Sequence, residues 1–296
     1  YCIPRQSEAG SKFVRKEKTS PDEKDSYIEL PGRVEYEYAQ NMLFPRMYSS
    51  SHAPLYKQWV DIKGYDVPYD QCGEMVMVNM PTQWENIKFF FSYQLNFMYW
   101  RYFMWNFAGR QNDIQGQGEI EHGNWITGIP FVDKFLVGDQ SLLPSDLKNN
   151  KGHNVFYCLP LILGLIGLFW QAYKTKRITT PNGEEIEEPI GIQQFWIVFF
   201  LFFMTGLAIV IYLNQTPMQP RERDYAYAGS FYAYAIWCGL GVLAIIDILK
   251  RKMKLSGTAV TAIVAVITLL VPIQMASQTW DDHDRSNRYT CREFGQ

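Results

Sequence analysis

Four long apolar runs constrain what this chain can fold into more than any other feature of its sequence. They cover residues 154–173, 193–213, 230–249 and 257–276. A helix needs about 20 apolar residues to cross a bilayer core of about 30 Å, and each run meets that length. The alternative is a very apolar core of a soluble helical protein, which such runs divided by short polar turns disfavour. We therefore expect a mainly α, polytopic membrane protein.

The charges of the turns predict which side of the membrane each one faces. Lys174, Lys176 and Arg177 follow the first run, and the basic stretch KRKMK follows the third. Basic residues beside a span favour the cytoplasmic side, whereas acids have little influence on orientation. The connector at 214–230 and the region after Ala276 then lie outside, which in a bacterium is the periplasm. We expect an integral protein of the bacterial inner membrane with these loops on its periplasmic side.

The rest of the chain divides around these runs. Residues 1–81 are polar and predict an external loop region, residues 108–153 predict a second external loop, and residues 277–296 begin an external C-terminal region. Residues 82–107 are crowded with aromatics, in a chain that is 16% aromatic. Trp and Tyr are typical of the membrane–water interface, so we expect an interfacial helix there. A fifth span is the alternative, and it would move residues 1–81 to the cytoplasm; charges inside the segment disfavour it.

The connector NQTPMQPRERDYAYAGS is more polar and more charged than a short turn requires. Its candidate binding residues are two arginines, an acid and two tyrosines: Arg221, Arg223, Asp224, Tyr225 and Tyr227. Forked guanidinium groups suit a phosphate or pyrophosphate at the membrane surface, and the tyrosines offer rings against which a sugar or lipid could lie. The alternative is a solvated cluster in which the arginines pair with the neighbouring acids.

A second group of candidates surrounds the end of the aromatic segment. Arg101 stands among aromatic residues, so its side chain must reach towards water, stack on a ring or pair with an acid. Arg110 and Asp113 follow it. Asp113 is a candidate for an ion partner or for a catalytic carboxylate.

The sequence after the fourth run carries acids, a histidine and arginines: Asp281, Asp282, His283, Asp284, Arg285 and Arg288. Consecutive residues of a helix do not all face one point, so an acidic helix end that pairs with the arginines is the favoured interpretation. A divalent cation held by Asp281, Asp282 and Asp284 is the weaker alternative. We expect no cofactor beyond that possibility.

Several function classes find no support in the sequence. It contains no glycine-rich nucleotide loop, Walker motif or nucleophile elbow. The scattered cysteines predict neither a disulfide framework nor a zinc site: Cys2, Cys72, Cys158, Cys238 and Cys291. The net charge is −2, and no nucleic-acid partner is expected.

Three segments carry a resemblance to a known family. YWRYFMWNFAGRQND, YLNQTPMQPRERDYAYAGSFYA and WDDHDRSNRYT closely resemble the middle of a bacterial family of multispanning membrane proteins. That family was long described as a domain of unknown function, is grouped with glycosyltransferase family 117, and is related to protein O-mannosyltransferases of the endoplasmic reticulum. The resemblance covers most of the chain from about residue 41 onward, and it implies that the chain is an internal piece of a longer protein.

The resemblance also implies a fold and an activity. It implies a GT-C-like helical bundle with external loops, in which a sugar passes from a polyprenyl-phosphate donor to Ser or Thr of exported acceptor proteins. The catalytic acid of such enzymes lies in an early external loop that this chain does not contain, so the catalytic residue is unassigned. The arginines of the connector would then stabilise the leaving lipid phosphate without a metal.

Two other functions fit the same membrane organisation. A transporter or flippase for lipid-linked sugars would use the arginines as headgroup contacts, but transporters place ionisable groups in mid-span, and these runs are almost free of charge. A non-catalytic scaffold of an export system would use the external loops as a docking surface.

Overall fold

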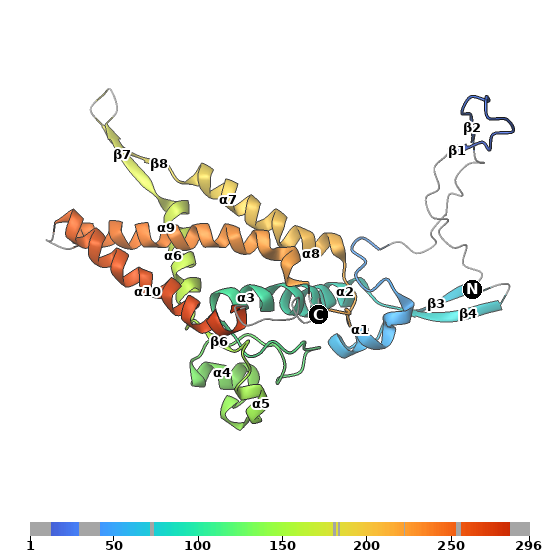
Figure 1. The fold of residues 1–296 in the computed structure, drawn as a ribbon, viewed down its shortest axis with the longest axis horizontal. Helices are drawn as coiled ribbons and strands as arrows, with labels where there is room; N and C mark the ends of the chain where they lie inside the picture. Colours follow the sequence, from blue (N-terminus) through green and yellow to red (C-terminus); the bar gives the residue numbers. More distant parts are fainter. Residues whose placement is uncertain are drawn as a thin grey trace, which may run out of the picture.

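The computed structural model describes residues 13–29, 42–71, 74–179, 182, 184–221, 223–252 and 256–284. The chain is mainly helical, as predicted (Figure 1). Its helical segments are η1 (Ser50–His52), α1 (Ala53–Trp59), α2 (Gln83–Phe89), η2 (Phe90–Trp100), α3 (Arg101–Phe107), α4 (Pro130–Val137), η3 (Gln140–Leu142), α5 (Ser145–Lys148), α6 (Leu159–Tyr173), α7 (Ile192–Thr205), α8 (Leu207–Leu213), η4 (Asp224–Tyr227), α9 (Ala228–Lys252) and α10 (Gly257–His283).

The strands of the described residues form two-stranded antiparallel hairpins. They pair β1 (Phe13–Arg15) with β2 (Tyr27–Glu29), β3 (Tyr65–Gln71) with β4 (Glu74–Met80), β5 (Gly109–Arg110) with β6 (Asn154–Val155), and β7 (Thr175–Thr179) with β8 (Glu185–Pro189). The β3–β4 and β7–β8 hairpins project from the helical body, whereas β5–β6 closes the lobe that carries α4 and α5 (Figure 1).

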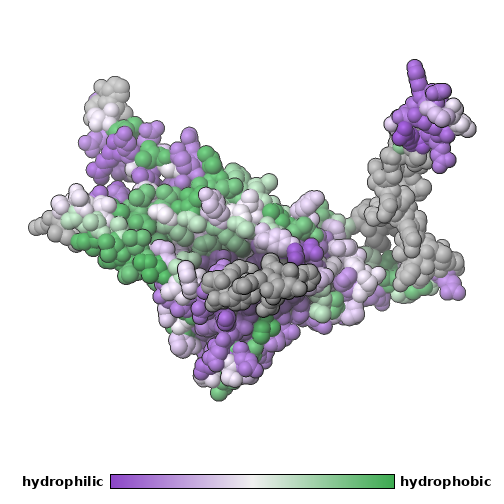
Figure 2. All heavy atoms as spheres, viewed as in Figure 1, coloured by the Kyte–Doolittle hydropathy of each residue, from purple (hydrophilic) through white to green (hydrophobic). Residues whose placement is uncertain are grey.

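Three helices in the described part of the chain are long and apolar enough to cross a membrane. They are Ile192–Leu213, Asp224–Lys252 and Gly257–His283. Apolar surface covers this helical region, while the β7–β8 hairpin and the α4–α5 lobe are largely polar (Figure 2). This pattern supports the expectation of a polytopic membrane protein.

The prediction of a span at 154–173 needs correction. Residues 154–155 pair as β6, and Tyr157 and Cys158 have φ angles of 53° and 55°, so the helix begins only at Leu159. Its 15 residues reach about 22 Å at about 1.5 Å per residue, which is less than a bilayer core of about 30 Å. By length alone, α6 therefore does not qualify as a span.

α6 packs closely along α9 because glycines remove side chains from their contact. A Cβ on Gly167 would overlap the carbonyl oxygen of Trp237, and one on Gly241 would overlap the carbonyl oxygen of Leu163. Small residues that let backbones approach are typical of helix contacts in membranes. Trp237 Nε1 also donates to Gln171 Oε1 at 2.8 Å, a buried polar link between the two helices.

The two basic turns lie at the same end of this bundle, as the charge pattern predicted. Trp170 Nε1 of α6 donates to Asp247 Oδ2 of α9 at 3.4 Å, and Arg251 Nη2 donates to the same oxygen at 2.9 Å. The amino group of Lys174 lies 4.0 Å from the centroid of the Trp170 ring. The ends of α6 and α9 therefore meet, and the connector before α9 lies at the opposite end. The compartment that each end faces stays a prediction.

The aromatic segment is a continuous helical run of α2, η2 and α3, and η2 has π-helical geometry. It begins at a capping box in which the Thr82 and Glu85 side chains each accept a hydrogen bond from the other residue's backbone N–H. The predicted helix is thus confirmed. Most of its aromatic side chains, however, are buried against the rest of the protein instead of facing outward. The run is the core around which the described helices pack, and its depth in a membrane stays a prediction.

Candidate functional site

Arg101 and Arg221, which are far apart in the sequence, line one narrow pocket with a cavity volume of about 10 Å³, which is room for about one water molecule. We call it the arginine pocket, and it is lined by Tyr93, Phe97, Met98, Arg101, Tyr102, Gln115, Gly116, Gln117, Gln219 and Arg221. Its walls come from the aromatic run, from the loop after β5 and from the connector. It therefore combines two guanidinium groups with amide side chains and aromatic rings.

The connector reaches the pocket because the aromatic run binds it. Tyr93 Oη donates to the carbonyl oxygen of Thr216 at 3.1 Å. Gln94 Nε2 donates to the carbonyl oxygen of Gln215 at 3.0 Å and to Asn214 Oδ1 at 2.9 Å. Tyr93 and Gln94 are themselves buried, so these bonds are shielded from water and position the connector.

The loop after β5 forms the third wall. Gln115 Nε2 donates to the carbonyl oxygen of Gln219 at 3.1 Å, which joins this loop to the connector. Within the loop, buried Asn112 accepts hydrogen bonds from the backbone N–H groups of Ile114 at 3.3 Å and Gly123 at 2.8 Å. The segment predicted as an irregular loop is thus irregular, but its buried amides hold it in one conformation.

Arg101 is buried, with only 3% of its surface exposed. Its Nε donates to the carbonyl oxygen of Phe97 at 3.1 Å, and its Nη1 donates to that of Gly123 at 3.0 Å. The guanidinium carbon lies 3.9 Å from the centroid of the Phe97 ring and 4.9 Å from that of Trp105. Stacking on aromatic rings, one of the possibilities left open for Arg101, is present in the structure.

Arg110 stacks on the same tryptophan. Its guanidinium carbon lies 4.5 Å from the centroid of the Trp105 ring, and its Nε donates to the carbonyl oxygen of Asn112 at 3.0 Å. Asp113 is exposed, and its carboxylate accepts a hydrogen bond from Asn150 Nδ2 at 2.7 Å. Neither Arg110 nor Asp113 lines the arginine pocket.

The charged residues of the connector separate in the structure. Arg221 is exposed, its Nη2 lies 3.3 Å from Tyr225 Oη, and this hydrogen bond raises its pKa. Arg223 is half-buried, and the Asp224 carboxylate accepts from the backbone N–H of Tyr225 at 3.0 Å, at the start of η4. Only Arg221 of these residues lines the pocket.

The two tyrosines of the connector also differ. Tyr225 is exposed, as expected for a residue that offers its ring to a ligand. Tyr227 is buried, and its ring lies edge-on to Tyr99 with centroids 5.6 Å apart. The expectation that both rings present an open surface is therefore wrong for Tyr227.

The acidic cluster lies on the last turn of α10, which packs against α9 and β6. His283 Nδ1 lies 2.9 Å from the carbonyl oxygen of Thr279 and 3.9 Å from Asp282 Oδ2. Among the described residues, no group of three or more His, Cys, Asp or Glu side chains is placed to hold a metal, so the alternative site of Asp281, Asp282 and Asp284 is not assembled there. Arg285 and Arg288 lie outside the described residues.

The pKa of the Glu119 carboxyl group is lowered in part by residues that line the arginine pocket. Its Oε2 accepts a hydrogen bond from the backbone N–H of Gln117 at 2.5 Å. This bond, with smaller contributions from the positive charges of His122 and Arg101, lowers the pKa of Glu119. Glu119 therefore stays ionised beside a pocket whose lining side chains are cationic or neutral.

Arg46 is a further buried cation that no sequence pattern indicated. Its Nη1 donates to the carbonyl oxygen of Ile211 at 2.9 Å, and its guanidinium carbon lies 3.9 Å from the centroid of the Phe44 ring. Burial lowers its pKa. Arg46 ties the segment before α1 to the last turn of α8, and its sequence neighbours do not predict that role.

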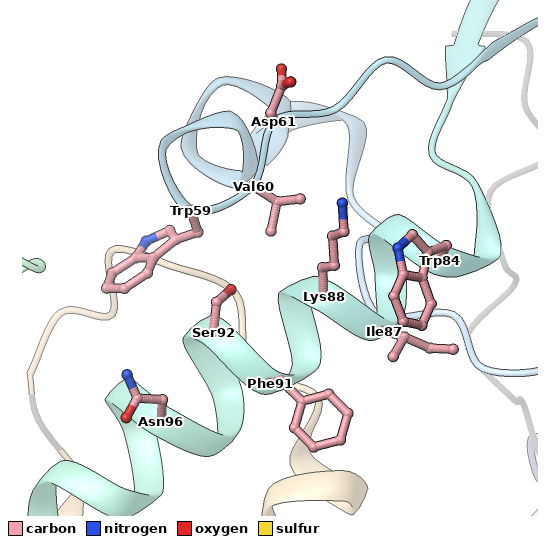
Figure 3. A pocket seen from close by; sticks show the side chains of 9 residues that line it. All are labelled: Trp59, Val60, Asp61, Trp84, Ile87, Lys88, Phe91, Ser92 and Asn96. Atoms are coloured by element: carbon pink, nitrogen blue, oxygen red, sulfur yellow. The ribbon is translucent and has the colours of Figure 1, made fainter.

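A larger groove of about 630 Å³ is lined in part by Trp59, whose ring also packs against the pocket residues Tyr93 and Phe97. It is lined by Trp59, Val60, Asp61, Trp84, Ile87, Lys88, Phe91, Ser92 and Asn96 (Figure 3). Trp59 and Trp84 mark its ends, the Lys88 side chain rises between them, and the Asp61 carboxylate points away (Figure 3). Sequence reasoning noted the charge of Lys88 but did not find this groove.

The comparisons with known proteins cover the N-terminal part. A family of unknown function, DUF8416, has a model that matches residues 4–91. The match includes most residues of the groove but neither arginine of the arginine pocket. No curated protein and no solved structure matches the chain.

Proposed function

We propose that this chain belongs to a membrane glycosyltransferase that moves a sugar from a lipid-phosphate donor to Ser or Thr of exported proteins. One observation supports this most: Arg101 and Arg221 line the same pocket. That pocket is built on the connector, at the end of the bundle opposite the basic turns. A lipid-linked donor presents its phosphate at the end of the spans, so this position suits it.

The pocket offers the chemistry that such a donor requires. When the bond between the sugar and the phosphate breaks, negative charge develops on the departing lipid phosphate. Guanidinium groups stabilise that charge through paired hydrogen bonds. Arg101 is held in place by two carbonyl groups, and Arg221 is exposed and able to move onto the phosphate.

The transfer itself needs one more group. The acceptor hydroxyl bonds to the anomeric carbon of the sugar, the sugar–phosphate oxygen bond breaks, and the hydroxyl proton passes to a base. We assign that base to no residue of this chain. The proposed role of these residues is to bind the donor and to stabilise the leaving phosphate, and it requires no metal.

Substitution of Arg221 tests the proposal. Arg221→Ala in the full-length protein, reconstituted with a polyprenyl-phosphate sugar and a Ser/Thr acceptor peptide, should slow transfer by about 100-fold. Arg221 is exposed, so its removal leaves the packing intact. The matched control is Arg177→Ala, because Arg177 has a 76% exposed side chain on β7, at the other end of the bundle. Transfer by Arg221→Ala at the rate of Arg177→Ala would refute the phosphate role.

A further inference from the structure

On α4 an acidic side chain faces inward and phenylalanine side chains face outward, which is the reverse of an amphipathic helix on a water-exposed surface. Its acid, Asp133, is 5% exposed and faces the lobe, together with buried Val137 one turn later. Phe131 and Phe135 point outward and are 74% and 79% exposed. A helix on the surface of a soluble protein turns its apolar stripe inward and its charges outward. The outward face of α4 is therefore unsuited to water.

Hydrogen bonds to Asp133 fix this orientation. Its Oδ1 accepts from the backbone N–H of Thr127 at 2.7 Å and from Thr127 Oγ1 at 2.8 Å, and its Oδ2 accepts from the backbone N–H of Gly128 at 2.8 Å. The helix cannot rotate its phenylalanines inward without breaking these bonds. The Phe131 and Phe135 rings pack edge-on with centroids 5.2 Å apart, so they form one continuous surface.

Further apolar side chains extend this surface. We define the α4 face as Ile129, Phe131, Phe135 and Leu136, all of which are exposed. Lys134 lies between the phenylalanines in sequence; its side chain is 69% exposed, and its Nζ lies 3.8 Å from Asp139 Oδ2. Apolar side chains bordered by a basic residue are the pattern of a helix that lies in the surface of a bilayer.

The α4 face adjoins the ends of the membrane helices. A Cβ on Gly128, just before α4, would lie against Val155 and the Tyr157 ring, immediately before α6. Gln274 Nε2 of α10 donates to the carbonyl oxygen of Val155 at 3.3 Å. Tyr157 and Leu159 are themselves exposed, so apolar side chains are exposed on both sides of this contact. Figure 1 shows α4 beside β6 and the last part of α10.

We propose that α4 is a surface anchor whose α4 face inserts into a phospholipid bilayer at the end of the spans opposite the basic turns. A partner protein fits this face less well, because its four side chains offer on the order of 400 Å². Stable protein interfaces bury at least about 1,000 Å² in total, or about 500 Å² on each partner. The inference holds whether or not the chain transfers sugars.

Site-specific photocrosslinking tests this contact. The photoreactive residue benzoylphenylalanine replaces Phe135 in the full-length protein, in nanodiscs of phosphatidylethanolamine and phosphatidylglycerol. After irradiation, mass spectrometry measures peptide–lipid adducts. Phe135 is exposed, so the larger ring needs no repacking. The control position is Asp146, an exposed residue of α5 in the same lobe.

We expect about tenfold more lipid adduct at position 135 than at position 146. Burial of one aromatic ring in lipid favours the inserted state over the water-exposed state by at least about tenfold. Equal yields at the two positions would overturn the proposal. An adduct at position 135 with a second copy of the chain, in place of lipid, would also overturn it and would make this face a protein interface.

Discussion

Asp133→Ala should release α4 from the lobe. The substitution removes the acceptor of three hydrogen bonds, two of them from backbone N–H groups of Thr127 and Gly128. A buried donor left without a partner costs about 1–3 kcal/mol. The variant no longer buries a charge, which offsets part of that cost. We expect a net loss of about 3 kcal/mol in the local stability of the segment 127–137.

Amide hydrogen exchange measures this loss directly. At 1.4 kcal/mol per factor of ten, the amides of Thr127, Gly128 and α4 should exchange on the order of 100-fold faster in the variant. Amides of α9 should not change, because the lobe opens without unfolding the bundle.

The control is Asp139→Ala. Asp139 accepts from the backbone N–H of Ser141 at 3.1 Å and from Ser141 Oγ at 2.6 Å, but its side chain is 41% exposed. Water replaces the lost acceptor there, so the cost should be small and exchange should change little. If both variants accelerated exchange equally, burial of the Asp133 contacts would not be what fixes α4.

Two further predictions concern packing and pH. Gly241→Leu should destabilise the contact between α6 and α9 by at least 1–3 kcal/mol, about the cost of overpacking a core. Gly239→Leu is the control, because Gly239 has open space around it and the substitution should not destabilise that contact. Thermal unfolding in detergent compares the two variants. Burial raises the pKa of Tyr56 from 10.0 to about 12. The folded protein therefore holds the tyrosine proton more tightly than the unfolded chain does, and the contribution of Tyr56 to the free energy of unfolding is complete below pH 10. That contribution is lost between pH 10 and 12, where the unfolded chain ionises first. Tyr56→Phe should remove that part of the pH dependence, and an unchanged fall in melting temperature between pH 10 and 12 would contradict it.

Long patterns in the sequence predicted the larger features. Runs of apolar residues identified the helices, and the basic turns predicted that the ends of α6 and α9 lie together. The beginning of α6 was not predictable, because Tyr157 and Cys158 adopt positive φ angles without a glycine or asparagine to mark them. Apolar composition alone cannot distinguish a strand and a turn from the first turns of a helix.

Side-chain positions within the candidate site were harder to predict. The topology placed Arg101 and Arg221 on the same side, and the structure brings them to one pocket. The different burial of Tyr225 and Tyr227 depends on the register of η4, which neighbouring sequence does not determine. Arg46 is buried through contacts with α8 and η2, more than forty residues away in the sequence, so no local pattern indicated it.

The bonds from Tyr93 and Gln94 to the connector also order the assembly of the pocket in time. One wall belongs to the aromatic run, and the opposite wall is synthesised only after α7 and α8. While the chain is still being made, the first wall exists without the second, and buried Gln94 lacks the carbonyl that it later binds. The pocket is thus complete only after α8 has been made and the connector that follows it has folded back, which is late in the biogenesis of the protein.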